Sequence, residues 1–455
     1  MTPQNIVQGN HLTLFKSPSD KALLVLFGLG VLFRLVFLMR FIDWGDHPLQ
    51  YDAFFHKLFV DFFARNFSFP QVDKDFEYPQ QPLYYIVAGL LSAALKNFPN
   101  YFELQTRILV ILSFVVSVSG LAFAWVLIRT YCKSSLGMIG AFSFFCFNPL
   151  QLFLAATINN DPFVLTLSEW STLGMIWVWK ACKPGWEFSF TLLGVLLALL
   201  TKLNVLTLVG VFGLILLFKY VSASPENRSD WGNRFYAFAL MIGLVIGLMF
   251  ARAYIPFTNE FRFINSGPYI GMEIDKLDWN YFLSFNLPTL IEQGHAQAHF
   301  IAHHDFVRQS FWTHLYGSMF MGVLQYKEIY QGYPHARVFG SFIFFFGICL
   351  PIFVMLGIYY SDRLLKLFNL GLLVSVTMMI IMILKYPSTC NNNFRYLFTV
   401  APLIGLLIGR GLDLIAKGPR WLIWLCAGFL TLLTISQLGW VISVISIPNH
   451  ILKNI

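Results

Sequence analysis

Long apolar stretches constrain this chain more than any other feature of its sequence. Stretches of about 18 to 25 predominantly apolar residues recur from one end to the other, and each is long enough to cross a hydrocarbon core about 30 Å thick as a helix. Hydrophobic residues make up 57% of the chain and charged residues 12%, against about 25% charged in ordinary soluble domains. Because every backbone amide must be satisfied in lipid, these stretches are predicted to be helices.

The predicted fold is an all-α polytopic membrane protein with about 11 transmembrane helices, or 12 if the short segment Pro82 to Leu95 also spans. The first stretch, Lys21 to Phe41, lacks a small-residue cleavage pattern and is expected to remain as an anchor. The expected crossings are 21–41, 105–129, 134–157, 161–180, a pair across 188–220, 235–255, 338–360, 364–385, 395–412 and 421–446.

Basic residues indicate which side of the membrane each loop occupies. If Pro82 to Leu95 is a re-entrant or juxtamembrane helix, the loops on the side of the N-terminus collect the lysines and arginines, which marks that side as cytoplasmic. The two long loops, 42–104 and 256–337, then face away from the cytoplasm and carry juxtamembrane helices. The basic residues are Arg129, Lys133, Lys180, Lys183, Lys219, Arg228, Arg234, Arg363, Lys366, Lys417 and Arg420.

Composition limits which partners and which domain organisation are expected. The net charge of +8 is modest and spread out, so membrane lipids are expected as partners and nucleic acid is not. The six cysteines show no paired spacing, which indicates neither a disulfide framework nor a thiolate metal site. Without a soluble domain or an internal repeat, residues 1–455 are predicted to form a single transmembrane domain.

The first long loop offers two carboxylates as catalytic candidates. Asp52 follows the first span closely in Tyr-Asp-Ala-Phe-Phe-His, and Glu77 opens a run in which Pro79 and Pro82 restrict the backbone. Most acidic residues of this loop are solvated charges on the simplest interpretation. His56 and Tyr84 belong to the same two segments and are candidate acceptor or loop contacts.

Further polar candidates lie at the same membrane face. Asn160 and Asp161 precede Pro162, where a capping role at a helix start and a functional role are both open. Lys202 lies at the apex of an apolar hairpin, where it either snorkels or binds phosphate. Arg395, next to Tyr396, opens a later span with a forked donor set that suits phosphate.

Three histidines of the second long loop have a helical spacing. His295, His299 and His303 would share one helix face, and pairs four residues apart can ligate a divalent metal. No glutamate completes a metalloprotease-type pair. A polar helix face or a substrate contact is the preferred interpretation, with no certain cofactor and a divalent-metal site as the alternative.

Taken together, these motifs resemble membrane glycosyltransferases of the GT-C class, specifically bacterial relatives of dolichyl-phosphate-mannose protein mannosyltransferases and of aminoarabinose transferases that modify lipid A. The matching features are the acid Asp52, the run Gln-Pro-Leu-Tyr-Tyr from Gln81, the pair at Asn160, the lysine Lys202 and the Arg-Tyr pair at Arg395. Two features depart from the family pattern, because Ala53 stands where a second acid is frequent and only one of two loop prolines is kept.

The resemblance implies transfer of a sugar from a polyprenyl-phosphate donor to an acceptor hydroxyl on a glycan, lipid or protein. It implies Asp52 as the base, Glu77 and Asp161 shaping the same cavity, and Lys202, Arg395 and Tyr396 at the donor phosphate. Direct displacement would invert the sugar. The expected location is a bacterial inner membrane, with the site facing the periplasm or exterior.

Two other functions remain as alternatives. A transporter or lipid flippase also has many helices and a few buried charges, but such proteins place polar groups near the bilayer midplane, whereas the candidates here cluster at one face. An inert scaffold protein, in which the acidic loop is surface decoration, is the second alternative.

Overall fold

The computed structural model describes residues 17–42, 53–74, 78–255, 258–262, 274, 277–293, 310–321, 334–388 and 392–447. Its elements are, in chain order, α1 Pro18–Phe41, α2 Ala53–Asn66, α3 Leu83–Leu95, α4 Tyr101–Tyr131, α5 Ser135–Phe147, α6 Pro149–Leu154, α7 Asp161–Lys180, α8 Trp186–Leu199, η2 Leu203–Val205, α9 Leu206–Ser222, α10 Pro225–Ala253, β1 Tyr254–Ile255, β2 Glu260–Phe261, α11 Trp279–Leu283, α12 Leu287–Gln293, α13 Phe311–Met321, α15 Pro334–Gly347, α16 Cys349–Tyr359, α17 Arg363–Lys385, η4 Phe394–Leu397, α18 Ala401–Ile415 and α19 Arg420–Ile445.

The protein is an all-α polytopic membrane protein, as the sequence predicts. Every range expected to cross the membrane contains helix, and seven helical segments of the described chain are long and apolar enough to cross a membrane. The seven are Pro18–Phe41, Tyr101–Tyr131, Leu203–Ser222, Pro225–Ala253, Pro334–Tyr359, Arg363–Lys385 and Arg420–Ile445.

Several expected crossings are built from shorter pieces. The range 134–157 contains α5 and α6, which divide where Asn148 accepts a hydrogen bond from the Leu150 amide at 3.0 Å and Pro149 begins the next helix. Such a cap and a proline at the first helical position are the usual start of a helix. The antiparallel pair of β1 and β2, which follows α10, was not expected from the sequence.

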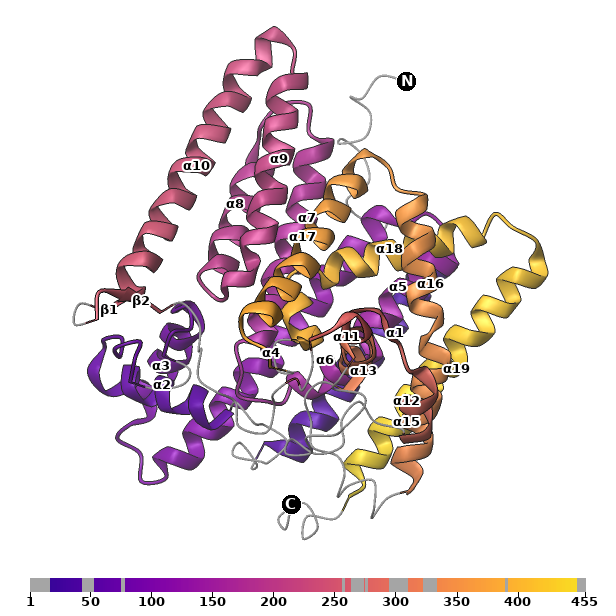
Figure 1. The fold of residues 1–455 in the computed structure, drawn as a ribbon, viewed down its shortest axis with the longest axis horizontal. Coiled ribbons are helices and arrows are strands. Elements are labelled where there is room, and N and C mark those ends of the chain that lie inside the picture. The colour runs from indigo at the N-terminus through magenta and orange to yellow at the C-terminus, as the bar shows by residue number, and fades with distance from the viewer. Residues whose placement is uncertain are drawn as a thin grey trace.

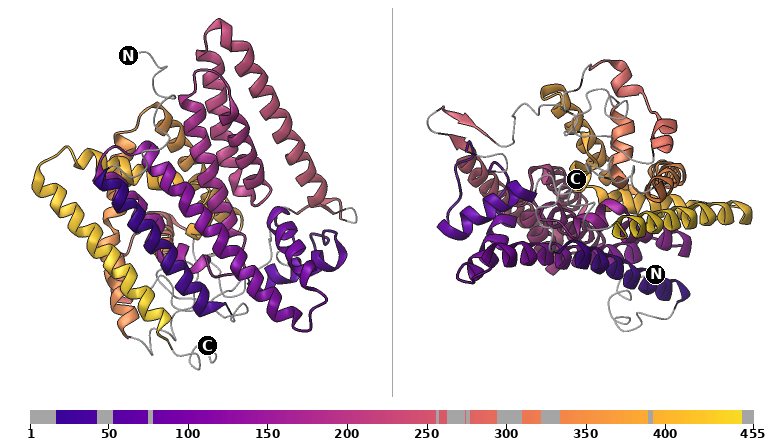
Figure 2. Two further views of the ribbon diagram at one scale, coloured as in Figure 1. Left: turned by 180° about the vertical axis from the view of Figure 1, so that it is seen from behind. Right: turned by 90° about the horizontal axis from the view of Figure 1, so that it is seen from below.

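The helices pack into one bundle whose members cross at varied angles (Figures 1 and 2). Helix α7 packs between α4 and α8, and α18 packs against α5 and α16. Close contact of α16 with α18 depends on glycines, because a Cβ at Gly357 would lie 2.1 Å from the Leu407 carbonyl oxygen and one at Gly411 would lie 2.1 Å from that of Phe353. Small residues at such positions allow backbones to approach within a membrane.

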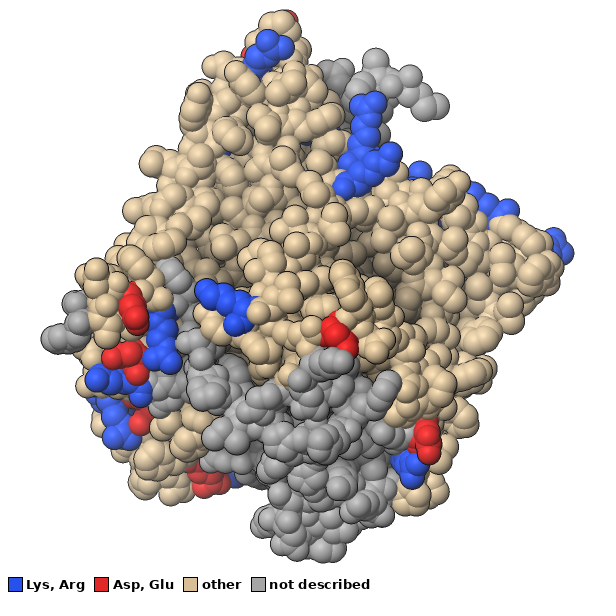
Figure 3. All heavy atoms as spheres, viewed as in Figure 1, with Lys and Arg blue, Asp and Glu red and all other residues tan. Residues whose placement is uncertain are grey.

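One end of the bundle, which we call the basic end, is joined by contacts between its turns. Arg129 at the end of α4 pairs with Asp20 at the start of α1 at 2.9 Å. Lys180 donates to the Thr130 carbonyl at 3.3 Å, and Lys219 donates to the Ala181 carbonyl at 2.8 Å. In Figure 3, lysines and arginines lie along the upper edge of the molecule above a broad belt without charges. These expected cytoplasmic turns therefore meet at a single end.

Helices α2 and α3 lie at the opposite end, below the end of α10 (Figure 1). The segment Leu83–Leu95 is a 13-residue helix that packs on α2 and α4. Its position agrees with a juxtamembrane helix. This arrangement brings the first loop next to the start of α7 and to the turn between α8 and α9.

Candidate functional site

Asp161 begins α7 at the end opposite to the basic end. The capping role that the sequence suggested for Asn160 or Asp161 is wrong, because the Asn160 side chain makes no cap hydrogen bond and the Asp161 amide instead donates to Asn159 Oδ1 at 2.8 Å. Asn159 therefore accepts from the first amide of the helix, and the Asp161 carboxylate meets other partners. That carboxylate is completely buried.

Two cations from distant parts of the chain converge on Asp161. Lys202 Nζ lies 2.6 Å from Asp161 Oδ1, and Arg395 Nη1 lies 3.5 Å from Asp161 Oδ2. Lys202 Nζ also lies 5.4 Å from the centre of the Tyr396 ring. We call these four residues the charged cluster. The structure thus brings together four of the residues singled out in the sequence, and two cations against one carboxylate give the cluster a net charge of +1.

Backbone contacts fix the turn that carries Lys202. Lys202 precedes the short helix η2, where the Leu203 amide donates to Gln81 Oε1 at 3.1 Å. The Asn204 side chain donates to the Tyr396 carbonyl at 2.9 Å. The turn is therefore held between the first loop and η4, which positions Lys202 beside Arg395.

Residues 78–82 join the first loop to the charged cluster. Asn160 Nδ2 donates to Gln80 Oε1 at 3.3 Å, which places Gln80 next to Asp161. Arg252, at the end of α10, donates to the carbonyls of Tyr78 and Gln80. The sequence indicated that the proline-containing run matters, but it predicted no contact for Gln80, Gln81 or Arg252. The signal in the sequence was the pair of prolines, which limit the freedom of the local backbone.

His56 and Tyr84, expected as acceptor or loop contacts, join α2 to α3. His56 Nδ1 is 2.7 Å from the hydroxyl of Tyr85, and the rings of His56 and Tyr84 pack edge to face at 5.9 Å. Tyr84 also packs on Phe163 of α7 at 5.4 Å. Both His56 and Tyr84 are buried, so their observed contacts are within the protein. Burial raises the pKa of Tyr84 well above its ordinary value, and its phenol stays protonated.

Five predicted residues lie outside the described residues. Asp52 directly precedes α2, and Glu77 directly precedes Tyr78, so neither carboxylate has a described position. The same holds for His295, His299 and His303, so the metal alternative is untested there. Among the described residues, no group of three or more metal-ligating side chains lies together.

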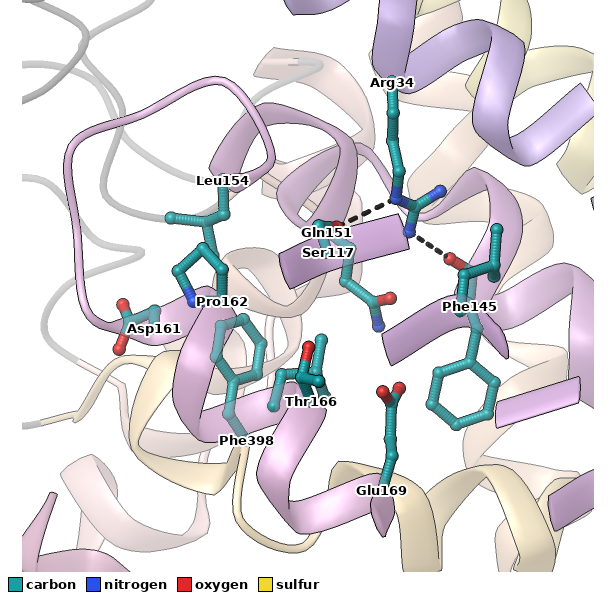
Figure 4. A pocket seen from close by; sticks show the side chains of 12 residues that line it. Arg34, Ser117, Phe145, Gln151, Leu154, Asp161, Pro162, Thr166, Glu169 and Phe398 are labelled. Atoms are coloured by element: carbon teal, nitrogen blue, oxygen red, sulfur yellow. Dashed lines mark hydrogen bonds between the residues drawn. The ribbon is translucent and has the colours of Figure 1, made fainter. Parts of the chain in front are cut away.

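A buried polar cavity extends from Asp161 into the bundle (Figure 4). Arg34 of α1 donates to the Phe145 carbonyl at 2.8 Å and to Ser117 Oγ at 2.9 Å. Glu169 Oε2 and Gln151 Nε2 are buried and have no hydrogen-bond partner among the described residues. The cavity measures about 10 Å³, which is about enough for one water molecule.

Arg34 and Glu169 correct the expectation that the ionisable groups cluster at one face. Both are buried within α1 and α7, away from the helix ends. Their positions inside apolar stretches were a sequence signal for intramembrane function, because charged groups at membrane depth are costly.

No protein-family model matches the sequence, and no curated protein matches it. Among solved structures, the crystal structure of ArnT from Cupriavidus metallidurans in the apo state is similar to this chain, with a TM-score of 0.48 and 12% identity, covering 93% of this chain and 75% of that chain. At this TM-score the similarity carries no conclusion about activity. The function is therefore inferred from the residues of the site.

Proposed function

We propose that this protein is a membrane glycosyltransferase that moves a sugar from a polyprenyl-phosphate donor to an acceptor hydroxyl on the non-cytoplasmic face, with inversion. The observation that carries the proposal is the convergence of Lys202 and Arg395 on the buried carboxylate of Asp161. The lipid tail of such a donor stays in the bilayer while its phosphate remains at the interface. A charged cluster at one end of a membrane helix bundle suits that geometry.

The charge of the cluster matches the chemistry of the donor. A donor phosphodiester carries one negative charge, and release as a monoester adds most of a second one, because the second pKa of a phosphomonoester is about 6. Two fixed cations bind the phosphate more strongly in the transition state, where this second charge develops, than in the ground state. This difference in binding accelerates the reaction. Lys202 and Arg395 keep 14% and 19% of their side chains exposed, so the phosphate approaches from that exposed side and not through the small cavity.

In the proposed reaction, the acceptor oxygen attacks the anomeric carbon from the face opposite the phosphate. A new bond forms between that carbon and the acceptor oxygen, while the bond to the phosphate oxygen breaks and its electron pair stays on the phosphate. Asp52 takes the acceptor proton, which is worth about 10²- to 10⁴-fold for a positioned base. Asp161, whose oxygens meet Lys202 and Arg395, holds these cations in place.

One observation favours the transporter or flippase as a second candidate. The buried Arg34 and Glu169, which line a polar cavity inside the bundle, are the kind of intramembrane groups that transporters use. The volume of about 10 Å³ holds no sugar or lipid headgroup in this conformation. Transfer therefore remains the better-supported function.

Cells with and without the protein distinguish these functions. We expect cells without it to accumulate a lipid-linked sugar and to lose one substituent from a surface glycan. Lys202→Met should reproduce both changes, and Lys183→Met, at an exposed position between α7 and α8, should reproduce neither. Unchanged glycans together with a lipid-linked sugar that changes membrane face would support the flippase instead.

A further inference from the structure

A second cavity lies beside the segment that contacts the charged cluster. It measures about 220 Å³ and is lined by residues 69–73 after α2 and by Arg252, Tyr254 and Ile255 at the end of α10. This volume is below the 300–1,000 Å³ typical of pockets for drug-sized ligands. It therefore fits one ring-sized group.

The walls of the cavity combine opposite charges with aromatic rings. Asp73 supplies a carboxylate and Arg252 a guanidinium, while Phe69 and Tyr254 are both partly exposed. The carboxylate accepts hydrogen bonds and the guanidinium donates them. Arg252 Nε is buried and has no hydrogen-bond partner among the described residues.

This chemistry selects an uncharged polyhydroxyl group. A cationic amine would meet Arg252 and also Lys74, whose Nζ lies 4.0 Å from Asp73 Oδ2, and an anionic ligand such as a phosphate would meet the Asp73 carboxylate, at a cost in both cases. Hydroxyl groups can bond to both side chains at once. The apolar face of a sugar ring can pack on Phe69 or Tyr254.

Arg252 connects this cavity to the charged cluster. Its guanidinium donates to the carbonyls of Tyr78 and Gln80, and Gln80 Oε1 accepts from Asn160, the neighbour of Asp161. A ligand that contacts Arg252 in the cavity and a phosphate at Lys202 would therefore be connected through residues 78–82. A transferase with two substrates requires such a pair of neighbouring sites.

We infer that the cavity between residues 69–73 and Arg252 binds a saccharide ring of the acceptor. This inference rests on the proposed function and adds the chemical class of the acceptor. Asp73 and Arg252 would hold the ring by its hydroxyls. The segment 78–82 would then transmit its position to the charged cluster.

Protection from alkylation tests binding without requiring activity. In the full chain with Cys182→Ser and Cys390→Ser, a single cysteine is introduced at one of two positions. Gln71→Cys places it in the lining of the cavity, and Ser68→Cys places it at an exposed position outside the cavity. The probes are methyl glycosides of glucose, galactose and mannose, with glycerol 3-phosphate as the anionic comparison. A glycoside at about ten times its Kd should slow alkylation of the Gln71→Cys variant about tenfold and leave the Ser68→Cys variant unchanged.

Asp73→Asn should weaken that protection by at least about tenfold in Kd, because a charge-assisted hydrogen bond is lost. Asp230→Asn, which is exposed at the basic end, is the matched control and should change nothing. Absence of protection by every glycoside, equal protection at both cysteine positions, or protection by glycerol 3-phosphate alone would each overturn the inference.

A second measurement separates this inference from the proposed function. In membranes that supply donor and acceptor, Asp73→Asn should raise the apparent acceptor KM and leave slow hydrolysis of the donor by water unchanged. If glycosides protect the cysteine but no donor is consumed, the saccharide site is supported and the proposed transferase activity is contradicted. Donor hydrolysis lost together with transfer would contradict an acceptor role for Asp73.

Discussion

At the residue scale, Asp52 is the residue to which we assign the role of base. Asp52→Asn keeps the shape of the side chain and removes its basicity, so transfer should fall by at least about 10²-fold while protein yield and donor binding are retained. Transfer rates in membranes, normalised to protein content, measure this effect. Near-parental transfer by Asp52→Asn combined with loss in Glu77→Gln would assign the base to Glu77.

The residues of the site show which inferences the sequence allowed. Asp161, Lys202, Arg395 and Tyr396 could be assigned to one membrane face because the spacing of spans fixes the face of each turn. Their mutual contacts could not be predicted, since α7, the turn after α8 and η4 meet only through tertiary packing. The bond of Asn159 to the Asp161 amide likewise required the structure.

Arg34 is expected to matter for stability. Arg34→Met removes hydrogen bonds to the carbonyls of Phe145 and Cys146 and removes a cation that interacts electrostatically with the buried Glu169. We expect a loss of about 1–3 kcal/mol or more in the free energy of unfolding. Thermal unfolding in detergent measures it, with Arg65→Met as control because Arg65 forms an exposed ion pair worth about 0–1 kcal/mol. Equal stability of both variants would refute this role.

At the element scale, the positions of the apolar helices followed from apolar length, whereas their packing depends on single glycines. Gly357→Ala would force a Cβ against the Leu407 carbonyl, so α16 and α18 must separate. We expect a cost of about 1–3 kcal/mol, as for overpacking in a protein core. Gly428→Ala in α19 is the control, because nothing lies within 4 Å of its Cβ position, and alanine favours helix. Equal unfolding temperatures for the two variants would contradict this packing.

The breaks within expected spans show why the element boundaries needed the structure. The length of the apolar run at 134–157 does not show that the run divides into α5 and α6, although Asn148 and Pro149 carry the capping signal. The β1 and β2 pair has only two residues in each strand, too few for a periodic pattern.

At the scale of the whole molecule, the contacts among basic turns predict a topology. Loops 42–104 and 256–337 should be non-cytoplasmic, because the basic end belongs to the cytoplasm by the positive-inside rule. Cysteines introduced by Ser68→Cys and Ser284→Cys in a Cys182→Ser and Cys390→Ser background should react with an impermeant label on intact cells or spheroplasts. In the parent chain with Cys390→Ser, the exposed native Cys182 should react only after the cytoplasmic face is opened. Labelling of the Ser68→Cys and Ser284→Cys variants from opposite sides would show that the segment Leu83–Leu95 crosses, and a full reversal of the pattern would show an inverted topology.

The whole account depends on the charged cluster binding the donor phosphate, and apparent donor affinity in the full-length protein tests this most directly. Lys202→Met and Arg395→Gln should each weaken donor affinity about tenfold or more, because each removes one charge-assisted contact of about 1.5–3 kcal/mol. Lys183→Met and Arg363→Gln, which change exposed cations away from the cluster, should retain parental affinity. Unchanged donor affinity in both Lys202→Met and Arg395→Gln, with the protein folded, would contradict the account.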